Sequence, residues 1–238
     1  MHLVAGPDAF LGILMLDTRF PRIVGDIGNA QSFDFPVIFR RMVGIGSADA
    51  VTAHPDRPRV LAALEANARA LAAEGAIGLS TSCGFLALYQ DDLSAVSPVP
   101  VATSALLLIE RLAGKRVGVL TASARNLTAA HFAAVGAPSD TPFGGLPEDS
   151  SFARTFIGNA TTLDREQVER EVVAAARDLV TRHPGLDTIV FECTNLPPYK
   201  RAVQDATGLP VLDVLDLLKG FYDGLTAAEG GDRRAAAG

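Results

Sequence analysis

One order of segments occurs twice along the chain, and this repetition constrains the fold more than any other feature. In each half an apolar strand, a helix, a strand ending in cysteine and a short Pro-Val strand follow one another. Cys83 and Cys193 are 110 residues apart, as are Pro100 and Pro210. Strands that alternate with helices predict parallel sheets with helices on both faces. We therefore expect an α/β protein of two pseudo-symmetric, Rossmann-like lobes.

The segments themselves follow from residue patterns. Apolar runs bounded by Gly and Pro predict strands, and the Ala-rich stretch from Pro58 to Glu74 has helical spacing with Pro in its first turn. Strands are expected near 12–16, 35–43, 76–83, 99–102, 116–121, 188–193 and 209–212, and helices at 58–74, 85–93, 104–112, 164–182 and 213–225. The tail 227–238 lacks a hydrophobic pattern, so we expect it to be frayed.

The repeat also predicts the division into lobes. Residues 1–104 together with 213–238 form the first lobe, which carries Cys83, and residues 105–212 form the second lobe, which carries Cys193. The last helix follows the final strand of the second lobe. In a two-lobe protein it is expected to cross back and pack on the first.

Composition narrows the functional classes. The net charge is −6, the basic residues are scattered and Trp is absent, which argues against nucleic acid as a partner. No apolar run reaches about 18 residues and the first strand has no basic segment before it, so neither a membrane span nor a signal peptide is expected. A cytoplasmic location fits, and there two distant cysteines are more often catalytic or inert than disulfide-bonded.

The two cysteines are the strongest candidates for chemistry. Each ends a strand at the carboxyl edge of its sheet, where open α/β sheets bind ligands. Facing lobes would place Cys83 and Cys193 on opposite sides of one cleft, so that one thiolate removes a proton and the other thiol delivers one. The alternative is that both are small buried hydrophobic residues. Their equivalent places in the two repeats favour the paired role, for which the site must lower the usual thiol pKa of about 8.5 or supply a partner.

The segments around these cysteines resemble a known family. Ser80-Thr-Ser-Cys83 and Glu192-Cys193-Thr194 are similar to motifs of the aspartate/glutamate/hydantoin racemase superfamily, and the resemblance runs from the first strand to the last helix. It implies a cofactor-independent enzyme of two pseudo-symmetric lobes, with Cys83 and Cys193 as acid and base. It also implies a substrate contact for Thr194 and a homodimer or higher homo-oligomer.

Two departures from the motifs bear on the substrate. Gly84-Phe85 stands where amino-acid racemases of this group have Asn-Thr, and Asn195 stands where glutamate racemases have His. The substrate therefore stays open between aspartate or glutamate, a hydantoin and another 2-substituted acid. The superfamily also contains maleate isomerases and arylmalonate decarboxylases, and the presence of both cysteines disfavours the decarboxylase.

Further residues are expected to line the cleft because they lie at strand ends. The substrate-binding candidates are Thr18, Arg19, Ser82, Gly84, Phe85, Thr121, Ser123, Thr194 and Asn195. Arg19 is a candidate carboxylate clamp, with a surface salt bridge as the alternative. Strand alternation assigns Glu192 only a minor role. The segments Asp17–Asn29 and Ala137–Asp149 are candidates for loops that close over the site.

Other chemistries fit less well. The chain has no phosphate-binding loop and no G-x-S-x-G elbow, its four histidines are dispersed, and its three lysines lack a strand-end setting, so no metal or other cofactor is expected. The sequence thus predicts a racemase or epimerase of an amino acid or related small carboxylate. The alternatives are a cis–trans isomerase of the maleate isomerase type and a non-catalytic small-molecule binder; a thiol redox protein is a further possibility.

Overall fold

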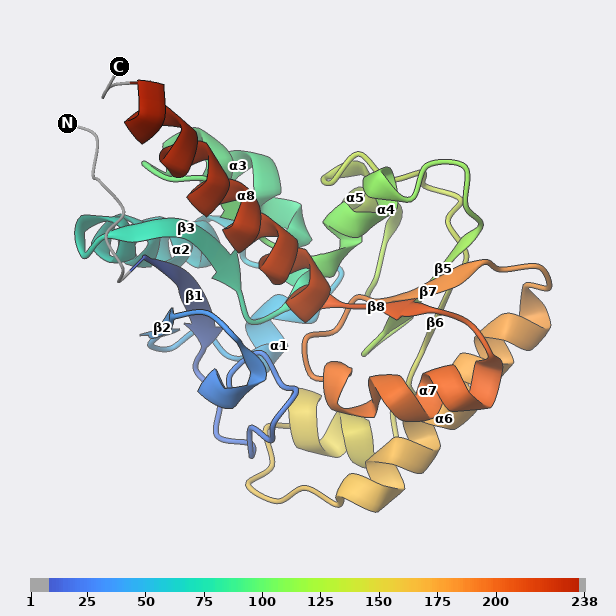
Figure 1. Ribbon diagram of the computed structural model, residues 1–238. Coiled ribbons are helices and arrows are strands. Elements are labelled where there is room, and N and C mark those ends of the chain that lie inside the picture. The colour runs from blue at the N-terminus through green and yellow to red at the C-terminus, as the bar shows by residue number, and fades with distance from the viewer. Residues whose placement is uncertain (1–8, 236–238) are drawn as a thin grey trace.

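The computed structural model describes residues 9–235 and contains two four-stranded sheets in two lobes (Figure 1). The first sheet consists of β1 (Phe10–Leu16), β2 (Val37–Met42), β3 (Ala76–Thr81) and β4 (Val101–Ala102). The second consists of β5 (Val117–Thr121), β6 (Phe143–Gly145), β7 (Thr188–Phe191) and β8 (Val211–Leu212).

Helices connect the strands within each lobe. In the first half they are η1 (Ala30–Ser32), α1 (Ser47–Ala50), α2 (Arg57–Ala73), η2 (Gly84–Tyr89), α3 (Gln90–Val96), η3 (Ala105–Leu107) and α4 (Leu108–Arg111). In the second half they are α5 (Ala129–Ala133), the π-helical turn η4 (Ala153–Ile157), α6 (Arg165–Arg182), η5 (Pro197–Tyr199), α7 (Lys200–Thr207) and α8 (Val214–Ala235). Asp56 and Asp164 cap the N-termini of α2 and α6, and the side chain of each accepts a backbone N–H of the first turn.

The two sheets have the same topology. Their strand orders are β2-β1-β3-β4 and β6-β5-β7-β8, and every pair of neighbouring strands is parallel. The second half therefore repeats the first strand by strand, which confirms the predicted α/β fold of two similar lobes. Because all strands of a sheet point the same way, the carboxyl ends of β3 and β7 carry Cys83 and Cys193 to the edges of the two sheets.

Helices cover both faces of the first sheet. Gly12 of β1 lies opposite Leu79 of β3, and a Cβ atom at Gly12 would collide with Leu71 of α2. Gly78, one position earlier on β3, would collide in the same way with Phe221 of α8. Since successive strand residues point to opposite faces, α2 and α8 pack on opposite sides of the sheet at closest approach.

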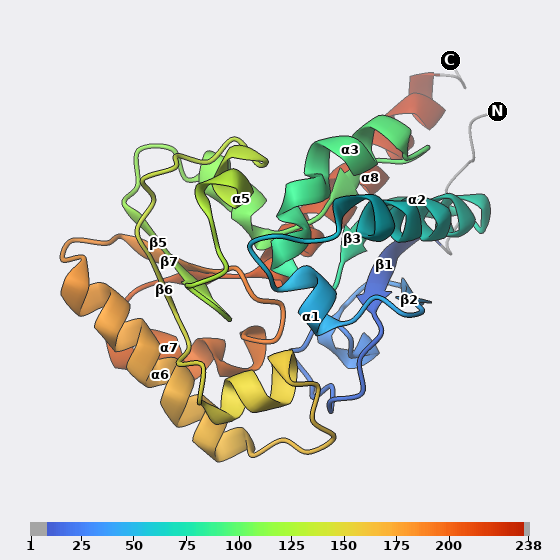
Figure 2. The ribbon, with the colours of Figure 1, turned by 180° about the vertical axis from the view of Figure 1, so that it is seen from behind.

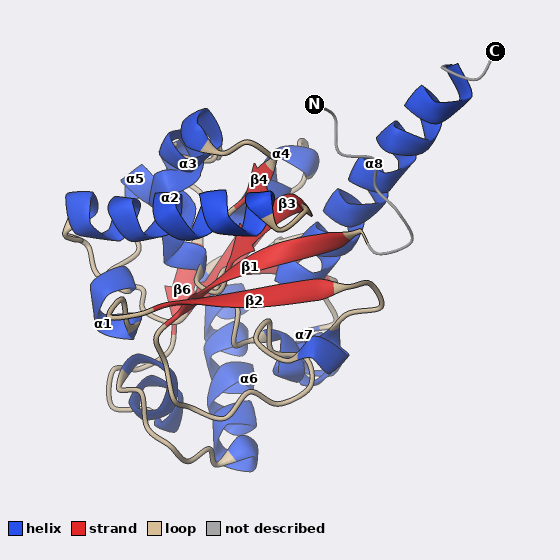
Figure 3. Ribbon diagram, turned by 90° about the vertical axis from the view of Figure 1, so that its left-hand side faces the viewer, coloured by secondary structure: helices blue, strands red, loops and turns tan. Residues whose placement is uncertain are grey.

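The helix that follows the last strand of each sheet packs on the other lobe. Helix α8 follows β8 of the second sheet but packs on β3 and β4 of the first, and Figures 2 and 3 show it beside the first lobe. The short helix η3 follows β4 and packs on β7. The expected crossing of the last helix is therefore present. The residue bounds of the lobes, 1–104 with 213–238 and 105–212, stay a prediction.

Three segments differ from the sequence-based expectation. Helix α8 continues to Ala235, because glycines weaken a helix by about 1 kcal/mol each without forbidding it; residues 236–238 lie outside the described part. The helix expected at 104–112 is a 3-10 turn followed by a single turn of α-helix. The segment Ala137–Asp149 was expected to be a loop but contains β6. The Gly-Gly pair of this strand lacks the side chains that give a recognisable strand pattern. Within residues 9–235, no helix has the length and apolar character needed to cross a membrane.

Candidate active site

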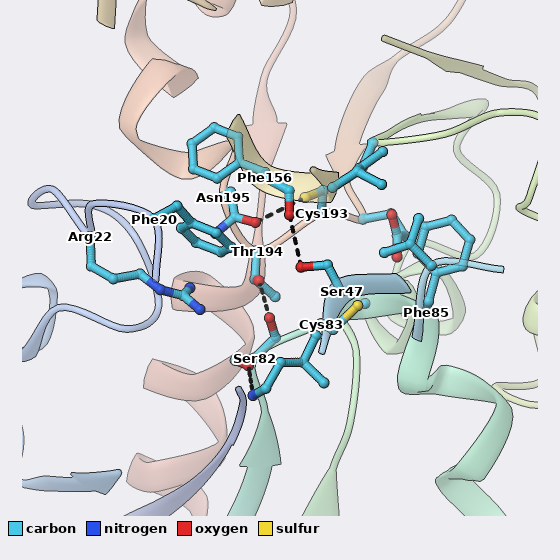
Figure 4. Close-up of a pocket in the computed structure, with 16 residues that line it drawn as sticks. Phe20, Arg22, Ser47, Ser82, Cys83, Phe85, Phe156, Cys193, Thr194 and Asn195 are labelled. Atoms are coloured by element: carbon cyan, nitrogen blue, oxygen red, sulfur yellow. Dashed lines mark hydrogen bonds between the residues drawn. The ribbon is translucent and has the colours of Figure 1, made fainter. Parts of the chain in front are cut away.

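A pocket lies between the carboxyl edges of the two sheets and takes residues from both lobes (Figure 4). Its cavity is about 20 Å³, room for about one water molecule. The lining residues are Leu16, Phe20, Arg22, Ser47, Val51, Ser82, Cys83, Gly84, Phe85, Ala122, Phe156, Ile157, Glu192, Cys193, Thr194 and Asn195. A substrate larger than water must displace some of these side chains.

Cys83 enters the pocket from the first lobe. It follows β3 with extended backbone angles and is the residue from which η2 starts. The turn directs the backbone N–H groups of Phe85 and Leu86 at its sulfur, and both lower the pKa of the thiol. Burial outweighs them: together with the nearby carboxyl of Glu192 it raises the pKa of Cys83 to about 12.

Cys193 enters from the second lobe in the equivalent way. The N–H of Asn195, two residues further on, faces its sulfur, as the N–H of Phe85 faces Cys83. The thiol also donates to Oδ1 of Asn195 over 3.7 Å, and Nδ2 of Asn195 in turn donates to Oδ2 of Asp26 at 2.6 Å. Burial first and Glu192 second raise the pKa of Cys193 well above its usual value. Both cysteines are therefore thiols at neutral pH, and neither is in a disulfide.

Hydrogen bonds across the pocket hold the lobes together. The hydroxyl of Thr194 donates to the carbonyl of Ser82 at 2.7 Å, and within the first lobe the Ser82 hydroxyl accepts the N–H of Leu16 at 2.9 Å. The hydroxyl of Ser47 in α1 donates to the carbonyl of Phe156 in η4 at 2.8 Å. These bonds join residues 66 to 112 positions apart. They fix the mutual position of the two sulfur atoms, which face the same space in Figure 4.

Arg22 is the positively charged side chain among the described residues that line the pocket. Its guanidinium donates to Oδ1 of the buried Asp26 at 2.8 Å and to the Thr18 hydroxyl at 2.9 Å, and it lies 4.2 Å from the ring centroid of Phe20. Phe20 in turn packs edge-on against Phe156 of the second lobe, with ring centroids 5.0 Å apart. Arg22 is thus held in place by an ion pair and an aromatic face, as a carboxylate-binding guanidinium requires.

Glu192 contributes a buried carboxyl to the same pocket. Its Oε2 accepts the hydroxyl of Thr121 at 2.6 Å, and the Ala122 N–H also faces the carboxyl. Burial outweighs these bonds and raises the pKa of Glu192 to about 7. The carboxyl and carbonyl oxygens of Glu192 lie so close to Gly84 that a Cβ atom there would overlap both. This contact gives a physical reason for glycine after the first cysteine.

Of the nine predicted substrate-binding residues, seven lie in or next to the pocket and two lie outside it. Ser82, Gly84, Phe85, Thr194 and Asn195 line it with the cysteines. Thr18 and Thr121 lie one contact away, bonded to Arg22 and Glu192 respectively. Ser123 is buried behind Thr121, whose hydroxyl accepts its N–H. The side chain of Arg19 is exposed and does not line the pocket; its N–H donates to Asn159.

Several lining residues were missed by sequence reasoning. Arg22 lines the pocket, and Arg19, which was predicted to do so, does not. The loop after β1 turns back on itself, and such a turn leaves no periodic pattern in the sequence. Of the two candidate closing segments, Asp17–Asn29 supplies the lining residues Phe20 and Arg22, whereas Ala137–Asp149 supplies no lining residue. Ser47 and Phe156 come from short elements that carry no recognisable motif. Among residues 9–235 no group of three or more His, Cys, Asp or Glu side chains is arranged to hold a metal ion.

Curated proteins similar in sequence are lyases by name. Dimethylsulfoniopropionate lyase of Durusdinium sp. clade D is 27% identical over 231 residues, which cover 90% of this chain and 76% of that protein. Dimethylsulfoniopropionate lyase 5 of Emiliania huxleyi strain CCMP1516 is 30% identical over 222 residues, covering 87% of this chain and 44% of that protein. The chain thus spans less than half the length of this second relative.

Solved structures share the fold at low sequence identity. Allantoin racemase from Klebsiella pneumoniae superposes with a TM-score of 0.65 at 14% identity, covering 92% of this chain and 88% of that one. Unliganded arylmalonate decarboxylase gives 0.59 at 17% identity, covering 94% and 93%. The family model for Asp/Glu/hydantoin racemase matches residues 48–218, which include both cysteines. The chain therefore belongs to the Asp/Glu/hydantoin racemase family.

Proposed function

We propose that this protein is a cofactor-independent enzyme that removes the α-proton of a small carboxylate with a thiolate of its cysteine pair. The observation that carries the proposal is the convergence of Cys83 and Cys193 on one pocket that also holds Arg22. Arg22 supplies a fixed partner for the carboxylate, and the thiols supply the base and the acid. Free thiols persist in a reducing compartment, so a cytoplasmic location is part of this proposal.

For the fate of the deprotonated substrate we propose elimination, with dimethylsulfoniopropionate as the substrate. This compound carries a carboxylate at one end and a dimethylsulfonium group on the β-carbon, next to the carbon that loses the proton. When the thiolate takes the proton from the carbon beside the carboxylate, the C–H electrons form the C=C bond. The C–S bond then breaks and its electrons leave with neutral dimethyl sulfide, while acrylate remains. Support comes from the relatives of 25–30% identity, all of which are named dimethylsulfoniopropionate lyases.

The pocket wall suits a cation without N–H groups. Phe20, Phe85 and Phe156 place three aromatic rings around the thiols, and methylated onium groups bind to aromatic faces. An amino-acid ammonium needs hydrogen-bond acceptors instead. The position after Cys83, which is Asn in the amino-acid racemases, is Gly84 and offers no side chain for that purpose.

A second candidate is racemisation of an amino acid or hydantoin. It is favoured by the equivalence of the two thiols, each of which receives the N–H of the residue two positions later. A two-base racemase needs such a pair on the two faces of one carbon, whereas an elimination needs only one base. A maleate-type isomerase and a non-catalytic binder stay as alternatives, and a homodimer stays a prediction.

The test is incubation in deuterium oxide with dimethylsulfoniopropionate and, separately, with aspartate, glutamate and 5-substituted hydantoins. We expect dimethyl sulfide by headspace gas chromatography and acrylate by NMR. Racemisation would instead appear as deuterium at the α-carbon without elimination. A lyase keeps measurable activity when only its acid cysteine is replaced, so one of Cys83→Ser and Cys193→Ser should be far less impaired than the other. A racemase loses turnover with either change. Folded protein that releases no dimethyl sulfide would refute the lyase assignment.

A further inference from the structure

Glu192 lies on the wall of the pocket, although strand alternation predicted that it would point away. Strand β7 ends at Phe191, so the alternation no longer holds at the next residue. The side chain of Glu192 is completely buried and lines the pocket together with both cysteines. The proposed chemistry assigns it no role.

The two carboxyl oxygens have different surroundings. Oε2 accepts the Thr121 hydroxyl, which comes from the end of β5. Oε1 has no hydrogen-bond partner among the residues that the structure describes, and it lies over Gly84, next to Cys83. A buried carboxyl oxygen without a partner is costly, so a group aimed into a ligand pocket in this way is satisfied when the ligand arrives.

The charges in the pocket decide which form of Glu192 is present during catalysis. The titratable and charged groups around it are Cys83 and Cys193, with Arg22 and its partner Asp26 on the loop after β1, while His131 of α5 lies edge-on against Phe85. Glu192 raises the pKa of both thiols when it is ionised. A thiolate and a Glu192 carboxylate therefore exclude each other in this small buried space, and the active enzyme needs the thiolate. Because hydrogen-bond donors face Oε2, Oε1 is the oxygen that carries the proton when Glu192 is neutral.

We propose that neutral Glu192 donates a hydrogen bond from Oε1 to the carboxylate of the substrate. The inference rests on the proposed abstraction of an α-proton, since negative charge then moves from the α-carbon onto the carboxylate oxygens. A carboxylic acid kept neutral by burial stabilises that charge without adding its own. Glu192 would thus be a substrate-binding residue whose donor strengthens as the proton leaves.

Proton uptake on binding tests this inference without turnover. Propionate carries the carboxylate but no leaving group. At pH 8 most Glu192 is ionised before propionate binds, because its pKa is about 7, so binding should draw in close to one proton. Isothermal titration calorimetry in two buffers of different ionisation enthalpy measures this number. Glu192→Gln should bind propionate with no uptake. Proton release, or equal uptake by both proteins, would overturn the proposal.

The pH profile of turnover gives the second measurement. Wild-type kcat/KM should rise with pH up to about 7 and then level off, because the reactive form, with a thiolate and neutral Glu192, has the same number of protons as the form with a thiol and ionised Glu192. Glu192→Gln keeps an N–H donor and stays neutral, so it should lose less than about tenfold at pH 6, and its kcat/KM should keep rising above pH 7, where only the thiol titrates. Glu192→Leu should lose about 10²-fold or more at every pH. A folded Gln variant without activity would identify Glu192 as a base and refute the donor role. If the enzyme turns over its substrate but propionate binding takes up no proton, only the donor role of Glu192 is refuted. If propionate binding takes up a proton but no turnover is seen, only the proposed reaction is refuted.

Discussion

Arg22 and Arg19 stand three positions apart in one loop, yet they have different surroundings. Arg22 lines the pocket and is held by Asp26, whereas the side chain of Arg19 is exposed. The two form a matched pair for testing which guanidinium recognises the carboxylate.

Arg22→Lys keeps the positive charge but loses the planar fork that binds two carboxylate oxygens. We expect KM for the carboxylate substrate to rise about tenfold, since a hydrogen bond to a charged group contributes about 1.5–3 kcal/mol. Arg19→Lys should change KM by less than about twofold. Steady-state kinetics of both variants decide the point, and equal values of KM would contradict the role of Arg22.

Gly84 is a second position at which a small change should have a large effect. A Cβ atom there would overlap backbone and carboxyl oxygens of Glu192, and a backbone oxygen in a strand-end turn cannot move aside. We expect Gly84→Ala to lower the free energy of unfolding by about 1–3 kcal/mol, the usual cost of overpacking, and to impair turnover. Gly224→Ala in α8 meets open space and should be neutral or slightly stabilising. Urea unfolding of the two variants would measure the difference.

At the scale of elements, the loop Asp17–Asn29 supplies Phe20 and Arg22 to the wall of the pocket. Phe20 belongs to the first half of the chain but packs in the core of the second lobe, against Phe156. The cavity holds about one water, so we expect substrate entry to open this contact.

Phe20→Ala should therefore expose the thiols. We expect iodoacetamide to alkylate Cys83 and Cys193 several-fold faster in this variant than in the wild type at the same pH, as followed by mass spectrometry. Phe33→Ala removes a ring of the same size that packs on Phe35, away from the pocket, and should leave the alkylation rate near the wild-type value. Equal acceleration in both variants would point to general loosening and against a local cover.

The elements also show which features of the fold and the site can be predicted from the sequence. Strand order, lobe number and the two thiols follow from the repeat, because apolar periodicity and equal spacing are properties of the chain itself. Arg22 and Phe156 could not be predicted, since their approach depends on how an irregular loop and a π-helical turn fold over the sheet edges. Glu192 was misjudged for a local reason: the rule of alternating sides fails where β7 ends.

At the scale of the whole molecule, Glu192 couples stability to pH. Burial raises its pKa from the ordinary value of 4.5 to about 7 in the folded protein. The unfolded chain therefore loses this proton first as the pH rises, and the folded state is penalised progressively between about pH 4.5 and 7. The full penalty is roughly 3 kcal/mol above pH 7 and vanishes below pH 4.5.

Glu192→Gln removes this penalty, because the amide does not ionise. We expect the variant to be more stable than the wild type at pH 8 by up to roughly 3 kcal/mol and to lose that advantage at pH 4. Urea denaturation at the two pH values measures both differences. An advantage that is the same at both values would show that Glu192 is not the titrating group.

The exchange of helices between the lobes has a consequence for the origin of the molecule. Helix α8 leaves the second sheet to pack on the first, and η3 leaves the first sheet to pack on the second. A half-length ancestor with this topology would have placed its last helix on another copy of itself. Two such copies would already have enclosed one pocket with one cysteine from each. Joining their genes would then have fixed the pairing and freed the two halves to diverge, one keeping Gly84 after its cysteine and the other Thr194.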